Sequence, residues 1–207
     1  MENIDATREA LGAAQLKQIR QVVAEEGILV LPTDTVYGIG ADPYSTDAVN
    51  AVLAAKGRGR QMPPPVLVAD VESAEKVSAH VGSVARKLME AFWPGGLTLI
   101  LPTAKDLHYD LGDIKDTIAV RMPDNPVALQ ILRAVGPLAV TSANLTGQSP
   151  ATDVDAARAY FQGKVDLYVD GGPTPGGVPS TIVDVTGEPK ILRSGVLDDT
   201  EVRRYWA

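Results

Sequence analysis

The sequence predicts an α/β fold built on a twisted, mixed, open sheet that is flanked by helices. Short apolar runs alternate with stretches of helical periodicity along most of the 207 residues. Polar residues, glycines and prolines follow many of these runs, as they do where strands end. No linker divides the chain, so we expect one domain over residues 1–207.

The first half of the chain is expected to begin with a long helix over residues 7–25. Apolar residues recur on one side of this segment, and Gly27 closes it. Gly38 and Gly40 indicate a turn after the first strand, and Thr46 is a suitable N-cap for the next helix. The elements expected after the first helix are, in order, strand 28–31, helix 46–55, strand 66–68, helices 73–80 and 83–92, and strand 97–101.

The second half continues the alternation and adds a loop rich in glycine and proline. The expected elements are strand 118–121, helix 126–135, strand 138–141, helix 153–161, strands 167–170, 181–185 and 190–192, and a short terminal helix. The segment GGPTPGGVP, residues 171–179, lies between two of these strands. Its biased composition favours a mobile loop over a site.

The composition indicates a soluble intracellular enzyme. Hydrophobic residues make up 45% of the chain, but no apolar run approaches the roughly 20 residues that span a bilayer. The N-terminus lacks the basic and apolar regions of a signal peptide. The absence of cysteine excludes disulfides, thiol catalysis and zinc–thiolate sites. A net charge of −7 argues against a general nucleic-acid binder.

Three alternating cations stand on a glycine-containing stretch. LPTDTVYGIG covers the first strand and its end, and KGRGR later places Lys56, Arg58 and Arg60 at every second position. The intervening glycines leave side chains and backbone N–H groups free to meet an anion. The alternative interpretation is a solvated basic loop, whose cations contribute little to folding.

Polar residues also mark four further apolar runs. They are Arg121 in TIAVR, Ser142 and Asn144 in TSANLTG, Ser180 in STIVDV, and Arg193 in ILR. Strand ends of open α/β sheets converge, so one cleft is expected there. Five cations sharing this cleft in an acidic chain would attract a small polyanion. Taken singly, the serine and asparagine also fit an ordinary turn, and the arginines fit surface ion pairs.

Several familiar active sites are not encoded. The chain has no GxxxxGK[ST] phosphate loop, no GxGxxG after the first strand and no GxSxG elbow. Only two histidines are present, His80 and His108, which argues against a histidine triad or a histidine-rich metal site.

Six motifs in order resemble the YrdC/Sua-type threonylcarbamoyl-adenylate synthases. They are PTDTVYGIG, KGR, TIAVR, TSANLTG, PSTIVD and ILRSG, and they cover roughly residues 11–196. The family's K-x-R and S-x-N signatures correspond to Lys56 with Arg58 and Ser142 with Asn144. The resemblance is to the short, single-domain form, and it implies a YrdC-like fold.

The resemblance implies an enzyme that joins L-threonine, bicarbonate or CO2, and ATP into threonylcarbamoyl-AMP and pyrophosphate. It assigns the triphosphate to Lys56, Arg58 and Arg60, with Lys56 and Arg58 as the catalytic pair. The other implied nucleotide contacts are Thr117, Ser142, Asn144, Pro150 and Arg193, and the implied threonine contacts are Thr33, Pro65, Arg121, Val140 and Ser180. Mg²⁺ is expected with ATP, held by phosphate oxygens and water, and no dedicated protein metal site is expected.

The same resemblance implies a cytoplasmic enzyme that supplies a tRNA-modifying transferase complex. Two other functions remain open: an RNA-binding paralogue without this activity, and a carbamoyl-adenylate-forming relative. The chain also departs from the family pattern at Gly59, at Met62 and at Asn125. These departures affect the expected contacts of the basic loop and of the helix that follows Asn125.

Overall fold

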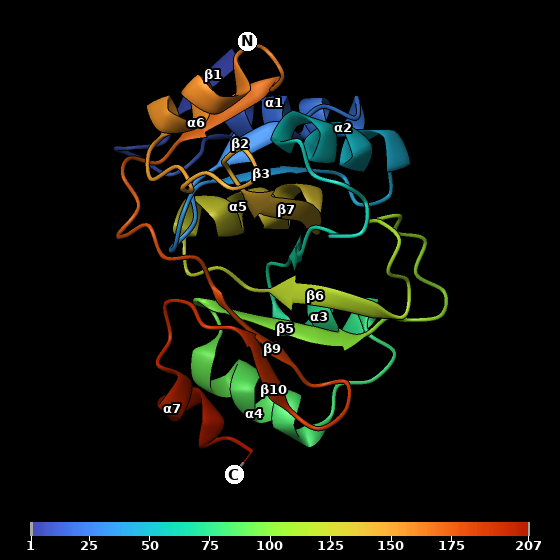
Figure 1. Cartoon of the computed structure of the whole chain (residues 1–207). Coiled ribbons are helices and arrows are strands. Elements are labelled where there is room, and N and C mark those ends of the chain that lie inside the picture. Colours follow the sequence, from blue (N-terminus) through green and yellow to red (C-terminus); the bar gives the residue numbers. More distant parts are fainter. Residues whose placement is uncertain (1, 207) are drawn as a thin grey trace.

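The computed structural model describes residues 2–206, which form one ten-stranded sheet with helices packed on it (Figure 1). The strands are β1 (Glu2–Asp5), β2 (Leu29–Leu31), β3 (Gly38–Ala41), β4 (Val66–Leu67), β5 (Leu97–Pro102), β6 (Thr117–Arg121), β7 (Leu138–Ser142), β8 (Leu167–Asp170), β9 (Thr181–Asp184) and β10 (Lys190–Arg193). The helices are α1 (Ala13–Ala24), α2 (Thr46–Lys56), α3 (Val71–Val77), α4 (Ser83–Phe92), α5 (Pro126–Val135), α6 (Val154–Phe161) and α7 (Asp199–Arg203).

The sheet is mixed and open, which confirms the predicted fold class. Its strand order is β1-β8-β2-β3-β7-β4-β6-β5-β9-β10. The pairs β1/β8, β2/β8, β4/β6 and β5/β9 are parallel, and the remaining pairs are antiparallel. The two-residue strand β4 sits between β7 and β6 and joins the two halves of the sheet.

The structure differs from the expected elements at several places, among them α3, which spans Val71–Val77 rather than residues 73–80. The first helix begins at Ala13 rather than at residue 7, because Gly12 is its N-cap and the Gln15 side chain accepts from the Gly12 N–H. Residues 2–5 form β1 on the edge of the sheet, beside β8. The expected glycine turn is strand β3, which lies between β2 and β7.

The glycines of β3 are required by the close approach of β7. A Cβ atom at Gly38 would lie 2.5 Å from Val140 Cγ1, and one at Gly40 would lie 2.7 Å from the Ala139 carbonyl oxygen. Glycine inside a strand commonly marks such an approach of another backbone. Gly38 and Gly40, from which the sequence predicts a turn, therefore allow β3 to pair closely with β7 inside the sheet.

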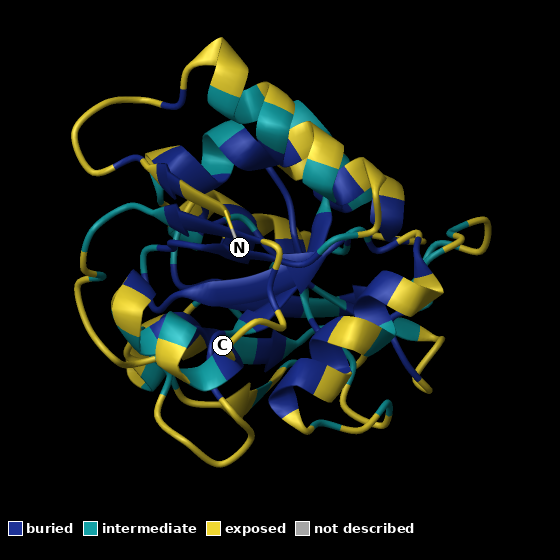
Figure 2. Cartoon of the chain, turned by 90° about the horizontal axis from the view of Figure 1, so that it is seen from above, coloured by how far each residue is buried: buried dark blue, intermediate teal, exposed yellow. Residues whose placement is uncertain are grey.

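The two halves of the sheet have separate cores. In the half built on β1, β8, β2, β3 and β7, helices α1 and α5 cover one face, and α2 and α6 cover the other. Seen from above, the buried strands run between helices whose outer surfaces are exposed (Figure 2). No helix within residues 2–206 is long and apolar enough to cross a membrane.

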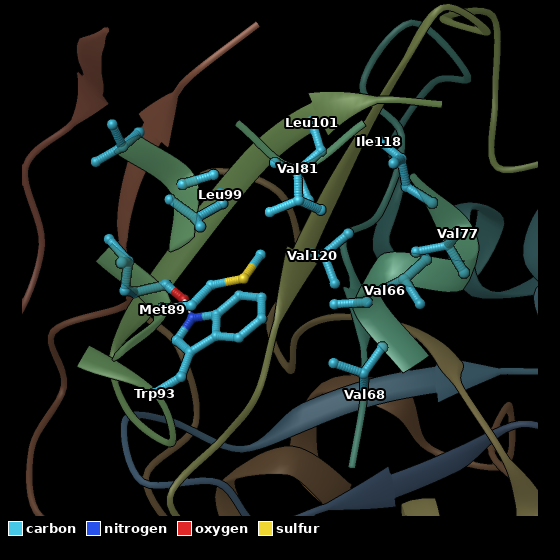
Figure 3. Packing of buried hydrophobic residues seen from close by; sticks show 14 of the residues in the cluster. Val66, Val68, Val77, Val81, Met89, Trp93, Leu99, Leu101, Ile118 and Val120 are labelled. Carbon is cyan, nitrogen blue, oxygen red and sulfur yellow. Dashed lines mark hydrogen bonds between the residues drawn. The ribbon is translucent and has the colours of Figure 1, made fainter. Parts of the chain in front are cut away.

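The second half of the sheet, built on β6, β5, β9 and β10, has its helices on one face. Leu99, Leu101, Ile118 and Val120 point toward α3 and α4 and pack in one cluster with Trp93 (Figure 3). Successive side chains of a strand point to opposite faces, so the intervening residues face the other way. These intervening residues form the floor of a cavity.

Candidate active site

A cavity of about 440 Å³ lies between the two halves of the sheet. Its floor includes Ile100, Ala119 and Ile182, and its walls come from strand ends and from the loop before β4. Nine of the predicted site residues line it: Thr33, Arg58, Pro65, Thr117, Arg121, Val140, Ser142, Ser180 and Arg193. The fold thus brings together residues that are as far apart in sequence as Thr33 and Arg193.

The cavity is strongly electropositive. Arg58, Arg121 and Arg193 line it, and none of its lining residues is acidic. Burial lowers the pKa of Arg58, and the charge of Arg193 lowers it further. Burial likewise lowers the pKa of Arg193, to which the charge of Arg121 adds. The positive charges of Arg58 and Arg193 therefore repel each other, as do those of Arg193 and Arg121. An anionic ligand between them would reduce this repulsion.

Arg121 is held rigidly at the end of β6, with 6% of the residue exposed. Its Nη2 lies 2.5 Å from Asp34 Oδ1, its Nη1 donates to Thr35 Oγ1 at 2.9 Å, and its Nε donates to the Gly95 carbonyl at 3.0 Å. A guanidinium has five N–H groups, so two remain for a ligand. The fixed fork suits a carboxylate.

The threonines after β2 form a hydrogen-bond chain whose direction can be deduced. Thr33 Oγ1 donates its one proton to the Val36 carbonyl at 2.6 Å. Thr35 Oγ1, 3.1 Å from Thr33 Oγ1, must therefore be the donor in that pair, and it accepts from Arg121. Both hydroxyl protons are thus used inside the protein. Thr33 Oγ1 also accepts from the N–H groups of Thr35 and Val36, at 3.2 and 3.3 Å, so Thr35 is the hydroxyl with a lone pair left for a ligand.

Lys56 is buried, which excludes a solvated loop position for this cation. It is the last residue of α2, is 3% exposed and does not line the cavity. Its Nζ donates to the Ser142 carbonyl, to the Asn144 carbonyl at 2.8 Å and to Asn144 Oδ1 at 3.1 Å. Burial and the nearby charge of Arg58 lower the pKa of Lys56 to about 8. Through these hydrogen bonds, Lys56 stabilises the turn at residues 142–144, which carries Ser142.

Asn144 serves the same turn and does not line the cavity. Its Oδ1 accepts from Ser142 Oγ at 2.6 Å, and its Nδ2 donates to the carbonyls of Leu145 and Gln148. Pro150 also lies off the cavity, next to Ala151, whose N–H donates to the Ala143 carbonyl at 2.9 Å. In the S-x-N signature, Ser142 thus lines the cavity, and Asn144 supports Ser142 from outside it.

Arg60 does not join the other cations. Its Nη2 lies 2.6 Å from Asp110 Oδ1, its Nε lies 3.5 Å from Asp113, and its Nη1 donates to Asn50. The expectation of five cations in one cleft therefore does not hold. Spacing placed Arg60 in line with Arg58, whereas two carboxylates of the β5–β6 loop bind its guanidinium.

Arg193 reaches the cavity from the edge strand β10. It donates from Nε and Nη2 to the Ser180 carbonyl at 3.1 and 2.7 Å, and from Nη2 to Ser180 Oγ at 3.2 Å. No partner of its Nη1 is found within residues 2–206, so that group is available to a ligand. Arg58 is held similarly, by Thr141 Oγ1 at 3.0 Å and by the Pro63 carbonyl at 3.4 Å.

Tyr37 is a site residue that sequence reasoning missed. Its hydroxyl donates to the Gly172 carbonyl at 2.7 Å and accepts from the Gly171 N–H at 3.1 Å. Burial raises the pKa of this phenol to about 12. Tyr37 therefore ties the start of the 171–179 loop to the turn after β2. Its position inside the motif PTDTVYGIG was the signal that could have identified it.

The departures from the family pattern have local explanations. Asn125 is the N-cap of α5, and its Oδ1 accepts from the Ala128 N–H at 3.0 Å. Met62 lies at the mouth of the cavity, where it forms an exposed apolar rim with Ile114 and Leu192. A Cβ atom at Gly59 would meet only the flexible Gln61 side chain. None of the three removes a cavity contact.

Residues 2–206 contain no group of three or more histidine or acidic side chains that could hold a metal ion. The cavity walls offer guanidinium, hydroxyl and carbonyl groups instead. This donor set does not fit a resident divalent cation, which prefers several carboxylate oxygens.

Comparisons with known proteins agree with the geometry. The Sua5/YciO/YrdC family model, described as "Telomere recombination", matches residues 21–195. A Mycobacterium tuberculosis protein, provisionally named a threonylcarbamoyl-AMP synthase, is 48% identical over 169 residues, covering 81% of this chain and 78% of that protein. The Bacillus subtilis threonylcarbamoyl-AMP synthase is 37% identical over 203 residues, covering 96% of this chain and 59% of the relative.

A solved structure gives the same result. The crystal structure of the Pyrococcus abyssi Sua5 protein complexed with L-threonine matches with a TM-score of 0.91 and 32% identity, covering 99% of this chain and 60% of that one. The chain thus spans about three fifths of the Bacillus and Pyrococcus proteins. The resemblance seen in the six motifs is confirmed: this chain belongs to the Sua5/YciO/YrdC family.

Proposed function

We infer that this protein is an L-threonylcarbamoyladenylate synthase, a nucleotidyltransferase that uses ATP. The observation that carries the inference is the acid-free cavity in which three arginines meet the hydroxyl groups of several threonines and serines. The named synthases among its relatives, and the L-threonine held by the Pyrococcus structure, support the same reaction.

The amino-acid end of the cavity lies around Arg121. Its two remaining N–H groups would bind the carboxylate of L-threonine, while Thr33, Thr35 and Ser180 would bind its polar groups. Pro65 and Val140 line the same cavity and would enclose the side chain. A fixed arginine and a preorganised polar wall reduce the cost of orienting the substrate.

The nucleotide end lies around Arg58 and Arg193. The carbamate oxygen of N-carboxy-threonine would attack the α-phosphorus of ATP, forming a new O–P bond as the bond to pyrophosphate breaks. Fixed guanidinium groups would stabilise the charge on the phosphates. Thr117 and Ser142 line this region, and Lys56, Asn144 and the backbone near Pro150 would hold the turn that carries Ser142.

Mg²⁺ would enter with ATP and be bound by phosphate oxygens and water. We further propose that the product passes to a tRNA-modifying transferase complex in the cytoplasm, where the modified tRNA is made. The alternative function is that of an RNA-binding paralogue without this activity.

Pyrophosphate release tests the function. Turnover should require L-threonine, bicarbonate and ATP together, and mass spectrometry should detect threonylcarbamoyl-AMP. Valine is nearly isosteric with threonine but lacks the hydroxyl, so it should support much weaker release because polar groups of the pocket would stay unpaired. Equal rates with valine, or turnover that instead requires carbamoyl phosphate, would contradict the assignment. Salt-sensitive RNA binding without turnover would favour a binding module.

A further inference from the structure

Thr98 is a buried polar residue in the floor of the cavity, and neither the sequence motifs nor the site described above uses it. It lies on β5 in the run LTLIL and is 1% exposed. Its neighbours Leu97 and Leu99 point into the core with α4, so the Thr98 side chain faces the cavity, which it lines. A valine would fill the same space without a hydroxyl, so the hydroxyl group needs a physical account.

The hydrogen bonds of Thr98 leave one proton without an acceptor. Thr98 Oγ1 lies 2.8 Å from Ser180 Oγ, and either oxygen can be the donor. Ser180 Oγ also accepts from Arg193 Nη2 at 3.2 Å. The two hydroxyls carry two protons, and only one of these can lie between the two oxygens. Within residues 2–206, no acceptor for the second proton is found, and both residues line the cavity.

We propose that Thr98 is a substrate-positioning residue whose pairing with Ser180 presents one hydrogen-bond donor to an oxygen of the bound amino acid. The inference rests on the proposed function, because it takes the cavity to bind L-threonine. Either Ser180 donates to Thr98 and Thr98 donates its own proton to the substrate, or Thr98 donates to Ser180 and Ser180 donates its own proton to the substrate. In both arrangements the pair supplies one donor with a fixed direction, and without the Thr98 hydroxyl the remaining Ser180 hydroxyl is no longer held in that direction.

Another hydroxyl that lines the cavity, that of Thr35, has the opposite hydrogen-bond polarity. Thr35 donates its proton to Thr33 Oγ1 and accepts from Arg121, so toward a ligand it can only accept. An amino acid with a free N–H or O–H and an oxygen acceptor matches both hydroxyl sites. Thr98 therefore completes a pattern that fixes which way round the substrate lies.

The test is calorimetric binding of L-threonine to Thr98→Val and Thr98→Ser. Valine keeps the shape of threonine and removes the hydroxyl, so we expect an about tenfold loss of threonine affinity, the effect of one lost hydrogen bond. Thr98→Ser keeps the hydroxyl and should restore binding to within about twofold. ATP affinity should be unchanged in both. Should Thr98→Val not fold, Thr98→Ala takes its place.

Thr103→Val is the matched control. Thr103 directly follows β5, and its buried hydroxyl has no partner within residues 2–206 and lies outside this cavity. Its removal should leave threonine binding unchanged. Equal threonine affinity in Thr98→Val and the wild type would overturn the inference while leaving the proposed function intact. Failure of the wild type to bind threonine would overturn both.

Discussion

The ion pair between the buried Arg121 and the partly buried Asp34 shows how one carboxylate can orient an arginine in a binding site. Asp34 Oδ1 accepts from Arg121 Nη2 at 2.5 Å and from the Asp124 backbone N–H at 3.0 Å. Asp34 does not line the cavity and occupies one N–H group of Arg121, so two other N–H groups of Arg121 remain available. A buried charge that lost this partner would be left unpaired in a poorly solvated place.

Asp34→Asn should therefore cost both stability and threonine binding. Breaking a buried pair from one side typically destabilises a protein by about 3 kcal/mol or more. Urea unfolding measures the first effect, and calorimetry with L-threonine measures the second. Asp124→Asn is the control, because Asp124 is exposed and contributes its backbone N–H to this contact. A stable Asp34→Asn variant with normal threonine binding would show that the pair is dispensable.

Lys56 should give the nucleotide site a pH dependence. The pKa of Lys56 is lowered from 10.5 to about 8, so its ammonium is complete below that pH and is lost as the pH rises through it. A neutral amine has two N–H groups for three acceptor oxygens and would loosen the turn of Ser142. ATP affinity should fall between about pH 7 and 9. A bound polyanion favours the charged form, which moves the midpoint upward.

Lys56→Met should bind ATP more weakly, by about tenfold, and with a flat profile over this range. The free energy of unfolding of the wild-type protein should not decrease between about pH 7 and 9. The unfolded chain retains the Lys56 proton up to its ordinary pKa of 10.5, so stability increases with pH between about 8 and 10.5. Parallel calorimetry and urea unfolding separate the two effects. A wild-type profile that matches the variant would exclude Lys56 as its cause.

The burial of Lys56 could not be predicted from its spacing. The sequence K-G-R-G-R shows that cations alternate, but not that Lys56 closes a helix whose end meets residues 142–144. The carboxylates that bind Arg60 lie 50 residues away or further along the chain. By contrast, Arg121, Ser180 and Arg193 could be predicted, because they stand where strands end and the sheet brings those ends together.

At the scale of elements, the end of β10 is placed by a close backbone contact. Gly195 follows β10, and a Cβ atom there would lie 2.4 Å from the Ser180 carbonyl carbon and 2.5 Å from the Pro179 carbonyl oxygen. The neighbouring Val196 N–H donates to that Pro179 oxygen at 3.0 Å. The segment thus supports Ser180 from outside the cavity.

Gly195→Ala should displace the segment that carries Ser180. All three nearest atoms are backbone, so the contact cannot be relieved by a side-chain rotation. We expect a loss of about 1–3 kcal/mol in the free energy of unfolding, as for other overpacked sites, together with weaker threonine binding. Gly187→Ala in the β9–β10 turn is the control, since its Cβ would meet nothing within 4 Å. Similar effects of the two substitutions would contradict this account.

The elements that sequence reasoning missed share a physical cause. In β1 only Ile4 is buried, so the strand lacks a regular alternation, and its place is set by pairing with β8 far along the chain. In β3 the glycines that suppress strand propensity are those that allow β7 to approach. Long apolar segments such as β5 and α5 could be predicted because their own residues supply the buried face.

At the scale of the whole molecule, ligand binding should connect the two halves. Arg58 is held by Thr141 of the first half and Arg193 by Ser180 of the second, so a ligand on both arginines bridges them. Saturating ATP and L-threonine, at about 100 times their dissociation constants, should stabilise the fold by about 2.7 kcal/mol for each ligand.

Hydrogen exchange locates this effect. The amides of Val68 and Val140, which donate to Arg121 and Pro65 across the junction at β4, should exchange more slowly in the presence of both ligands. Amides of α1 lie away from the cavity and serve as the control. Protection of the α1 amides alone would show that the ligands bind elsewhere.

The narrow junction at β4 has a mechanical consequence. The two halves of the sheet are joined through the two residues of β4, Val66 and Leu67. Positively charged arginines lie close to one another in the cavity between the halves. Without an anion, the repulsion between Arg58 and Arg193 opposes the attraction of the Arg121–Asp34 pair, which also joins the two halves. A polyanion between the arginines reverses the sign of that repulsion. The negative charge of the substrate would therefore attract the arginines of both halves and hold the halves together. Departure of pyrophosphate would remove much of that attraction.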